Sequence, residues 1–143
     1  PKPEIYMKIL VVEDDFVSRA VLTQLLPDLG QTDVAINGRE AVEAVQAALD
    51  RDEPYKLICL DIMMPEMDGR EALKKIRAAE DAAGREGLQR AKIIMTTALN
   101  ASDEIMNAFR DECDGYLVKP IQPYEVSKLF DQLGLEAPKG WSH

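Results

Sequence analysis

Five short apolar runs alternate along the chain with longer amphipathic stretches. The runs are continuously apolar, as in Ile9–Val12 and Leu57–Leu60, which is typical of central strands covered on both faces. Between the runs, apolar residues recur at the three- and four-residue spacing of helices that pack against a core. Repeated strand–helix units predict a mostly parallel sheet with helices on both sides. The predicted strands cover residues 8–13, 32–36, 56–60, 92–96 and 115–118.

Five helices are expected between and after these strands. The first is expected to end at Gly30, or a turn earlier because Pro27 would interrupt its hydrogen bonds. Segment 78–90 carries two glycines among many charges, which predicts a frayed helix end and a surface loop. Pro123 suits the first turn of the last helix. The apolar residues that define the five helices lie within 17–29, 41–49, 72–76, 105–109 and 126–133.

Composition limits the class of protein. A chain of 143 residues with 46% hydrophobic content fits one domain. The net charge of -9 argues against nucleic-acid binding, which needs clustered Lys and Arg. The chain shows neither a signal peptide nor an apolar run long enough to span a membrane, so a cytoplasmic location is expected. Cys59 and Cys113 are expected as reduced, buried thiols rather than a disulfide.

The chemically distinctive side chains follow the predicted strands. Asp14 and Asp15 come after the first strand, Asp61 after the third, Thr97 after the fourth and Lys119 after the fifth. The carboxyl ends of parallel strands share one rim, which is where such sheets bind ligands. We therefore expect these residues to meet in one crevice.

Carboxylates gathered on one rim need a compensating cation. Mg²⁺ suits them, because it takes one or two carboxylates together with a phosphate oxygen and several waters. Asp14 or Asp15 has an alternative role as the cap of the following helix. Met63 offers only its backbone carbonyl to a hard cation, and Asp68 is expected as a turn or cap residue rather than a ligand.

A hydroxyl and a cation complete the set. Thr97 offers its hydroxyl to a phosphoryl oxygen, and Thr96 is the alternative. Alone, a strand-end Thr is usually a good β-former and a strand-end Lys such as Lys119 is usually solvated. Pro120 fixes the turn that follows. The hypothesis of a phosphoryl site therefore depends on the combination of these residues.

Together these segments resemble the receiver domain of bacterial response regulators, the phosphorylated partner in two-component signalling. The matching segments are VVEDD at 11–15, DIMMPEMDG at 61–69, TA at 97–98 and DGYLVKP at 114–120. The resemblance implies a doubly wound five-stranded parallel sheet of order 2-1-3-4-5 with five helices, a flavodoxin-like three-layer sandwich. It implies a stand-alone, chemotaxis-receiver-like domain over residues 7–134, with an extension at 1–6 and a tail at 135–143.

The same resemblance implies roles for single residues. Asp61 would be the phosphoacceptor. Glu13 receives no role, because the family often has an acid just before its acidic pair. The implied Mg²⁺ ligands are Asp14, Asp15, Asp61 and the backbone carbonyl of Met63. The residues implied to respond to phosphorylation are Thr97, Lys119 and Tyr116, with a cis peptide bond before Pro120.

The resemblance also implies partners. The phosphoryl donor would be a phosphohistidine on a sensor histidine kinase or a phosphotransfer protein. The fourth helix, fifth strand and fifth helix would form the surface that changes, and a separate output protein or a second copy of the chain would bind it. Met63 and Leu99, two residues beyond Asp61 and Thr97, are apolar, so we predict slow self-dephosphorylation.

Three alternatives remain. A haloacid-dehalogenase-like phosphatase also uses a strand-end Asp and Mg²⁺, but it requires a second Asp where Met63 stands. A flavodoxin-like cofactor binder would need a Ser/Thr/Gly-rich loop after the first strand instead of Glu13-Asp14-Asp15. A degenerate, non-phosphorylated receiver would be expected to lack one of the site residues.

Overall fold

The computed structural model describes residues 7–25, 30–62, 68–98 and 113–134. Five strands form one parallel sheet of order β2-β1-β3-β4-β5, which confirms the predicted order. Each strand begins and ends within two residues of its predicted bounds. The strands are β1 (Met7–Val12), β2 (Gly30–Ala35), β3 (Leu57–Asp61), β4 (Lys92–Thr97) and β5 (Gly115–Val118).

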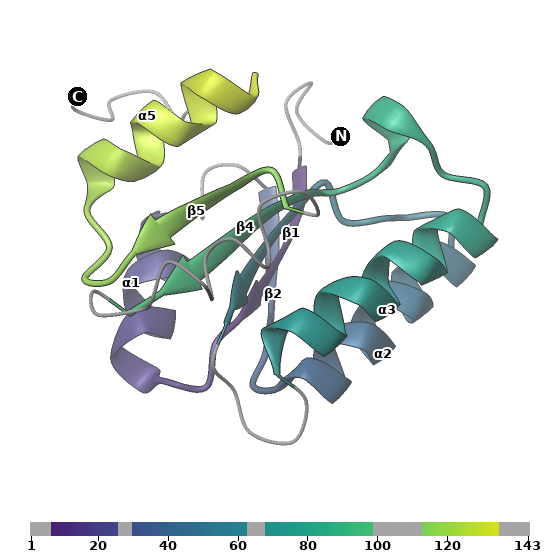
Figure 1. Cartoon of the computed structure of the whole chain (residues 1–143), viewed down its shortest axis with the longest axis horizontal. Coiled ribbons are helices and arrows are strands. Elements are labelled where there is room, and N and C mark those ends of the chain that lie inside the picture. Colours follow the sequence, from purple (N-terminus) through teal and green to yellow (C-terminus); the bar gives the residue numbers. More distant parts are fainter. Residues whose placement is uncertain (1–6, 26–29, 63–67, 99–112, 135–143) are drawn as a thin grey trace.

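Helices cover both faces of this sheet (Figure 1). The predicted fourth helix, near 105–109, lies outside the described residues. The described helices on one face are α2 (Gly38–Asp50) and α3 (Gly69–Ala82), and those on the other are α1 (Phe16–Leu25) and α5 (Pro123–Leu133). None of the helices in the described ranges is long and apolar enough to cross a membrane.

The core has two halves because successive strand residues point to opposite faces of the sheet. Leu10 and Ile58 pack with α2 and α3 residues such as Ile76. Ile9 and Leu57 pack with Phe130 and other residues of α1 and α5. All five residues of β3 are buried. This double cover explains why the strand sequences are continuously apolar.

Two local predictions were wrong. Gly30 does not end α1; it is the first residue of β2 and pairs with Met7. Segment 78–90 is regular helix as far as Ala82, so its start is not frayed; the predicted surface loop follows and contains a short 3-10 helix, Gly87–Gln89. The helix continues because Glu80, in its last turn, is buried and accepts a hydrogen bond of 2.7 Å from the Ala91 backbone.

Several helix ends agree with the sequence. Asp68 is the N-cap of α3 and accepts a hydrogen bond of 2.9 Å from the Glu71 N–H, so its predicted capping role is confirmed. Pro123 lies in the first turn of α5, and Gly134 caps the other end with a φ of 74°. Cys59 is buried, Cys113 is half-buried, and both are free thiols.

Candidate functional site

The carboxyl ends of the strands carry the candidate site. Strand registers place Leu60 beside Val12, Thr96 beside Asp61 and Val118 beside Thr97. All five arrows in Figure 1 run towards the same edge of the sheet, as parallel pairing requires. The residues at or just after these ends therefore share a rim, as the sequence predicted.

Lys119 joins two carboxylates across this rim. Its Nζ lies 2.6 Å from Oε1 of Glu13 and 3.3 Å from Oδ2 of Asp61. Burial alone would lower the pKa of Lys119, but the contacts with Glu13 and Asp61 outweigh burial and raise it above its ordinary value. Lys119 is therefore a fixed positive charge beside the Asp61 carboxylate.

Glu13 is the unexpected member of this group. Its side chain is fully buried. Burial, followed by the hydrogen bond and charge of Asp61, raises the pKa of Glu13 to about 7, although Lys119 acts in the opposite direction. Its Oε2 accepts a hydrogen bond of 3.2 Å from the Asp15 backbone, whereas Oε1 touches Lys119 without hydrogen-bond geometry. The site is thus short of positive charge.

Three carboxylates gather closely enough to share a cation. Single oxygens of Glu13, Asp14 and Asp61 all lie within 4.8 Å of one another. Glu13 and Asp61 are buried, and Asp14 is exposed, which leaves the group open to solvent on one side. One lysine cannot balance three carboxylates, and hard oxygen ligands of this kind suit Mg²⁺. The donor set and the Glu13 oxygen without a hydrogen bond therefore fit a magnesium ion.

Asp15 lies outside this group of three carboxylates. Its Oδ2 accepts hydrogen bonds from the backbone N–H of Ser18 (3.0 Å) and from the Ser18 hydroxyl (2.7 Å). These two bonds hold the pKa of Asp15 below its ordinary value. Asp15 therefore caps α1, as the alternative interpretation proposed. The two adjacent acids that gather with Asp61 are Glu13 and Asp14, one residue earlier than the predicted pair.

Thr97 ends β4 on the same rim. It is buried, and its hydroxyl donates to the Ala98 carbonyl at 3.5 Å rather than to the carboxylates. Its backbone oxygen accepts a hydrogen bond of 2.8 Å from the Lys119 N–H, which ties the ends of β4 and β5 together. Thr96, the alternative, has a buried hydroxyl with no hydrogen bond to any described residue.

The remaining predicted residues lie around this centre or outside the described residues. The Lys119–Pro120 peptide bond is cis. Tyr116 is 52% exposed on β5, so its ring faces outwards. Met63 and Leu99 lie outside the described ranges.

Gly69 fixes the backbone on which Asp61 stands. A Cβ at position 69 would lie 2.5 Å from the Asp61 backbone oxygen and 2.8 Å from Cα of Ile62. The Gly69 N–H donates to the Ile62 carbonyl at 3.0 Å. This close approach of α3 to the end of β3 requires a glycine at position 69.

A model of the response regulator receiver domain matches residues 9–131 of the chain. The chain belongs to the response regulator receiver family. Receivers of this family are phosphoacceptors in two-component signalling, and histidine kinases and phosphotransfer proteins are their partners.

Individual relatives cover nearly the whole chain. The chemotaxis protein CheY homolog of Campylobacter jejuni is 34% identical over 135 residues, which are 94% of this chain and 98% of that protein. The receiver domain of the histidine kinase CKI1 from Arabidopsis thaliana, complexed with Mg²⁺ and BeF3-, has a TM-score of 0.79 at 27% identity over 92% of this chain and 93% of that one. A Pseudomonas aeruginosa sensor kinase receiver, with a magnesium ion in its active site cleft, has a TM-score of 0.71 at 27% identity over 90% of this chain and 98% of that one.

Proposed function

We propose that this receiver, spanning residues 7–134, accepts a phosphoryl group on Asp61 from a phosphohistidine of a sensor histidine kinase or phosphotransfer protein. The observation that carries the proposal is the position of Asp61. Its buried carboxylate lies 3.3 Å from the Lys119 ammonium and shares the rim with Glu13 and Asp14. The Arabidopsis kinase receiver complexed with Mg²⁺, and the Pseudomonas receiver with a magnesium ion in its active site cleft, support a metal at this site.

Phosphoryl transfer requires the protein mainly to position the reacting groups and to stabilise negative charge. A carboxylate oxygen of Asp61 attacks phosphorus, the P–N bond of the phosphohistidine breaks, and the histidine nitrogen leaves with the bonding electrons. Lys119 neutralises part of the negative charge that the phosphoryl oxygens bring to the rim. When bound by Glu13, Asp14 and Asp61, Mg²⁺ supplies further positive charge there. The backbone carbonyl of Met63 remains a proposed fourth ligand.

Phosphorylation would change the surface through Thr97 and Tyr116. The Thr97 hydroxyl, now directed to the Ala98 carbonyl, would turn to a phosphoryl oxygen. The outward ring of Tyr116 would then turn inwards, which would change the surface formed by β5, α5 and the predicted fourth helix. A separate output protein or a second copy of the chain would bind that surface.

Phosphorylation with acetyl phosphate and Mg²⁺ tests the proposal, with intact mass as the readout. The parent should gain one phosphoryl group, whereas Asp61→Asn should gain none. Labelling of Asp61→Asn, or no labelling of a folded parent, would refute the assignment.

Two matched variants separate the acidic residues. Asp14→Asn removes a proposed metal ligand and should lower the labelling rate strongly. Asp15→Asn makes the same chemical change at the adjacent position but keeps the N-cap of α1, because Asn and Asp cap helices about equally well. Asp15→Asn should therefore be labelled at nearly the parent rate. Equal losses in the two variants would contradict the reassignment from Asp15 to Glu13.

Slow self-dephosphorylation also remains a prediction. Polar replacements at Met63 and Leu99 should accelerate the loss of phosphate from phosphorylated Asp61. Timed intact-mass measurements after removal of acetyl phosphate would measure it, and unchanged or slower loss would contradict it.

A further inference from the structure

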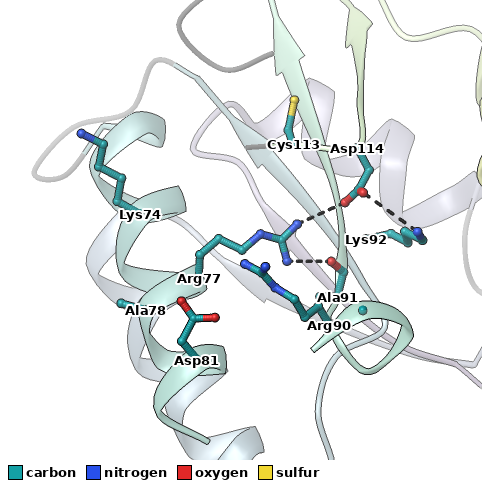
Figure 2. Close-up of a pocket in the computed structure, with 10 residues that line it drawn as sticks. Lys74, Arg77, Ala78, Asp81, Arg90, Ala91, Lys92, Cys113 and Asp114 are labelled. Carbon is teal, nitrogen blue, oxygen red and sulfur yellow. Dashed lines mark hydrogen bonds and ion pairs between the residues drawn. The ribbon is translucent and has the colours of Figure 1, made fainter. Parts of the chain in front are cut away.

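Two adjoining cavities lie at the opposite edge of the sheet from Asp61. The larger, of about 610 Å³, lies between α3, the start of β4 and the residues before β5 (Figure 2). The smaller, of about 280 Å³, extends towards the end of α5. Arg90 and Lys92 line both. Lys56 and Asp61 bracket β3, so this edge lies about 17 Å from the rim at roughly 3.3 Å per residue.

Basic side chains gather around these cavities in an otherwise acidic protein of net charge -9. Among the described residues, four carboxylates offset this positive charge. Asp81 and Asp114 line the larger cavity, and Asp52 and Glu80 form ion pairs with basic residues of the lining. The basic residues number six, an excess of two positive charges over these carboxylates. They are Lys56, Lys74, Arg77, Arg85, Arg90 and Lys92.

One buried and one partly buried carboxylate hold the centre of this cluster in place. Glu80 is 4% exposed and accepts hydrogen bonds from Arg77 (2.7 Å) and from Nε of Arg90 (3.4 Å). Asp114 accepts from the Ile93 backbone N–H at 2.8 Å and from Arg77 at 3.2 Å. Figure 2 shows the Arg77 guanidinium between Asp114 and the Ala91 carbonyl. The guanidinium groups are therefore positioned before any ligand arrives.

Three cations remain available at the smaller cavity. Lys56 is exposed and forms no ion pair with a described residue. Lys92 is 4.0 Å from Asp114, the limit of an ion pair. Arg90 uses only Nε towards Glu80, so its two terminal nitrogens are open to a ligand as far as the described residues show. A backbone hydrogen bond of 2.9 Å from Lys92 to Lys56 keeps these two residues adjacent.

We propose that the paired cavities bind a small phosphomonoester that carries hydroxyl groups. Its dianionic phosphoryl group would lie against Lys56, Arg90 and Lys92, where it matches the excess of two positive charges. The hydroxylated part would enter the larger cavity, where Asp81 and Asp114 offer carboxylate oxygens as hydrogen-bond acceptors. A phosphosugar and a nucleoside monophosphate share this chemistry. The proposal does not depend on phosphorylation of Asp61.

Calorimetric titration tests it with the full chain in EDTA, so that metal-dependent binding of phosphate at the Asp61 rim is suppressed. The probes are glucose 6-phosphate, AMP, inorganic phosphate and glucose. We expect at least one of the two phosphomonoesters to bind more tightly than inorganic phosphate, and glucose not to bind. The tighter of the two identifies the source of the ligand. Absence of saturable binding, or equal affinity for inorganic phosphate and both phosphomonoesters, would overturn the proposal.

Matched variants locate the site. The double variant Lys56→Gln/Lys92→Gln should weaken phosphomonoester binding at least about tenfold, while its labelling by acetyl phosphate with Mg²⁺ shows that it is folded. Lys128→Gln removes an α5 lysine outside both linings and should leave binding unchanged. Asp61→Asn should also bind normally, which separates this site from the phosphoacceptor site. Unchanged binding in the double variant would overturn the proposal.

Discussion

Alanine at position 69 should disturb Asp61 although neither side chain touches the other. The new Cβ would lie 2.5 Å from the Asp61 backbone oxygen, whereas ordinary contact begins at 3.4 Å. The end of β3 must therefore move by about 1 Å, and the clashing atoms are backbone atoms that cannot rotate away. Such overpacking costs about 1–3 kcal/mol. The higher helix propensity of alanine offsets at most about 1 kcal/mol of this cost. We therefore expect the free energy of unfolding to fall by about 1–2 kcal/mol.

The displacement should affect phosphorylation more than stability. A loss of 1–2 kcal/mol lowers the melting temperature of a domain this size by about 2–8 °C, which leaves the protein folded at 25 °C. A shift of about 1 Å at a reacting group can cost about 100-fold in rate. Gly69→Ala should therefore be labelled by acetyl phosphate at least about tenfold more slowly than the parent under conditions where both are folded.

Gly115→Ala provides the control, measured with the same melting and labelling assays. Its Cβ would also meet an atom at 2.8 Å, but that atom is Cδ1 of Leu129, the end of a flexible side chain. The leucine can rotate, and a strand gains from losing a glycine, so we expect little change in stability or labelling. Unchanged labelling of Gly69→Ala, or an equal loss in both variants, would refute the argument that backbone contact at Gly69 positions Asp61.

Three further predictions concern buried charge. Burial and Asp61 raise the pKa of Glu13 to about 7, so ionisation of Glu13 destabilises the fold at higher pH. Without metal at pH 8, Glu13→Gln should therefore have a higher melting temperature than the parent. Its affinity for Mg²⁺, measured by calorimetry, should be at least about tenfold weaker. Glu80→Gln should lower the free energy of unfolding, measured by urea denaturation, by about 3 kcal/mol. The control Glu71→Gln, which breaks an exposed ion pair with Lys75, should lower it by about 0.5 kcal/mol or less. Burial alone would raise the pKa of Asp33, but its hydrogen bonds, led by the one from the Tyr55 hydroxyl (2.6 Å), lower it. Ionised Asp33 therefore stabilises the fold, and this contribution is lost as the pH falls below about 4. Tyr55→Phe should cost about 1 kcal/mol at pH 7 and show a smaller loss of melting temperature between pH 7 and pH 3.

The sequence predicted the strands because their residues are buried on both faces, which leaves an uninterrupted apolar signal. It placed the predicted site residues at one edge of the sheet because each of them closely follows such a run. The order of the strands came from the resemblance and not from any single segment. The choice of Asp14 and Asp15 as metal ligands came from the resemblance, and periodicity could not test it, because periodicity fixes a strand end only to within a residue or two. Three consecutive acids offered no polarity change to locate it.

Glu80 shows a different limit. The sequence carried a signal, since Glu80 follows Ala72 and Ile76 at four-residue spacing and therefore lies on the buried stripe of α3. A charge at such a position is normally expected at the surface. Arg77 lies one turn earlier on the same helix, but Arg90 and Ala91 lie beyond it, and only the fold shows that the loop returns these two residues to Glu80. Compensation of a buried charge by residues beyond the same helix could not be predicted from helical spacing.

The two edges of the sheet handle charge in opposite ways, and the difference bears on function. At the amino-terminal edge, the buried Glu80 accepts hydrogen bonds from two guanidinium groups and a backbone N–H, so this carboxylate is structural. At the carboxyl-terminal edge, Lys119 is the cation that contacts Glu13 and Asp61 within the part of the chain that the structure describes, and Asp14 lies close to both carboxylates. A fold can satisfy buried carboxylates with its own donors, as it does at Glu80. At the rim, Oε1 of Glu13 accepts no hydrogen bond from the described residues. We therefore expect the stability and the chemistry of the rim to depend on a cation from solution.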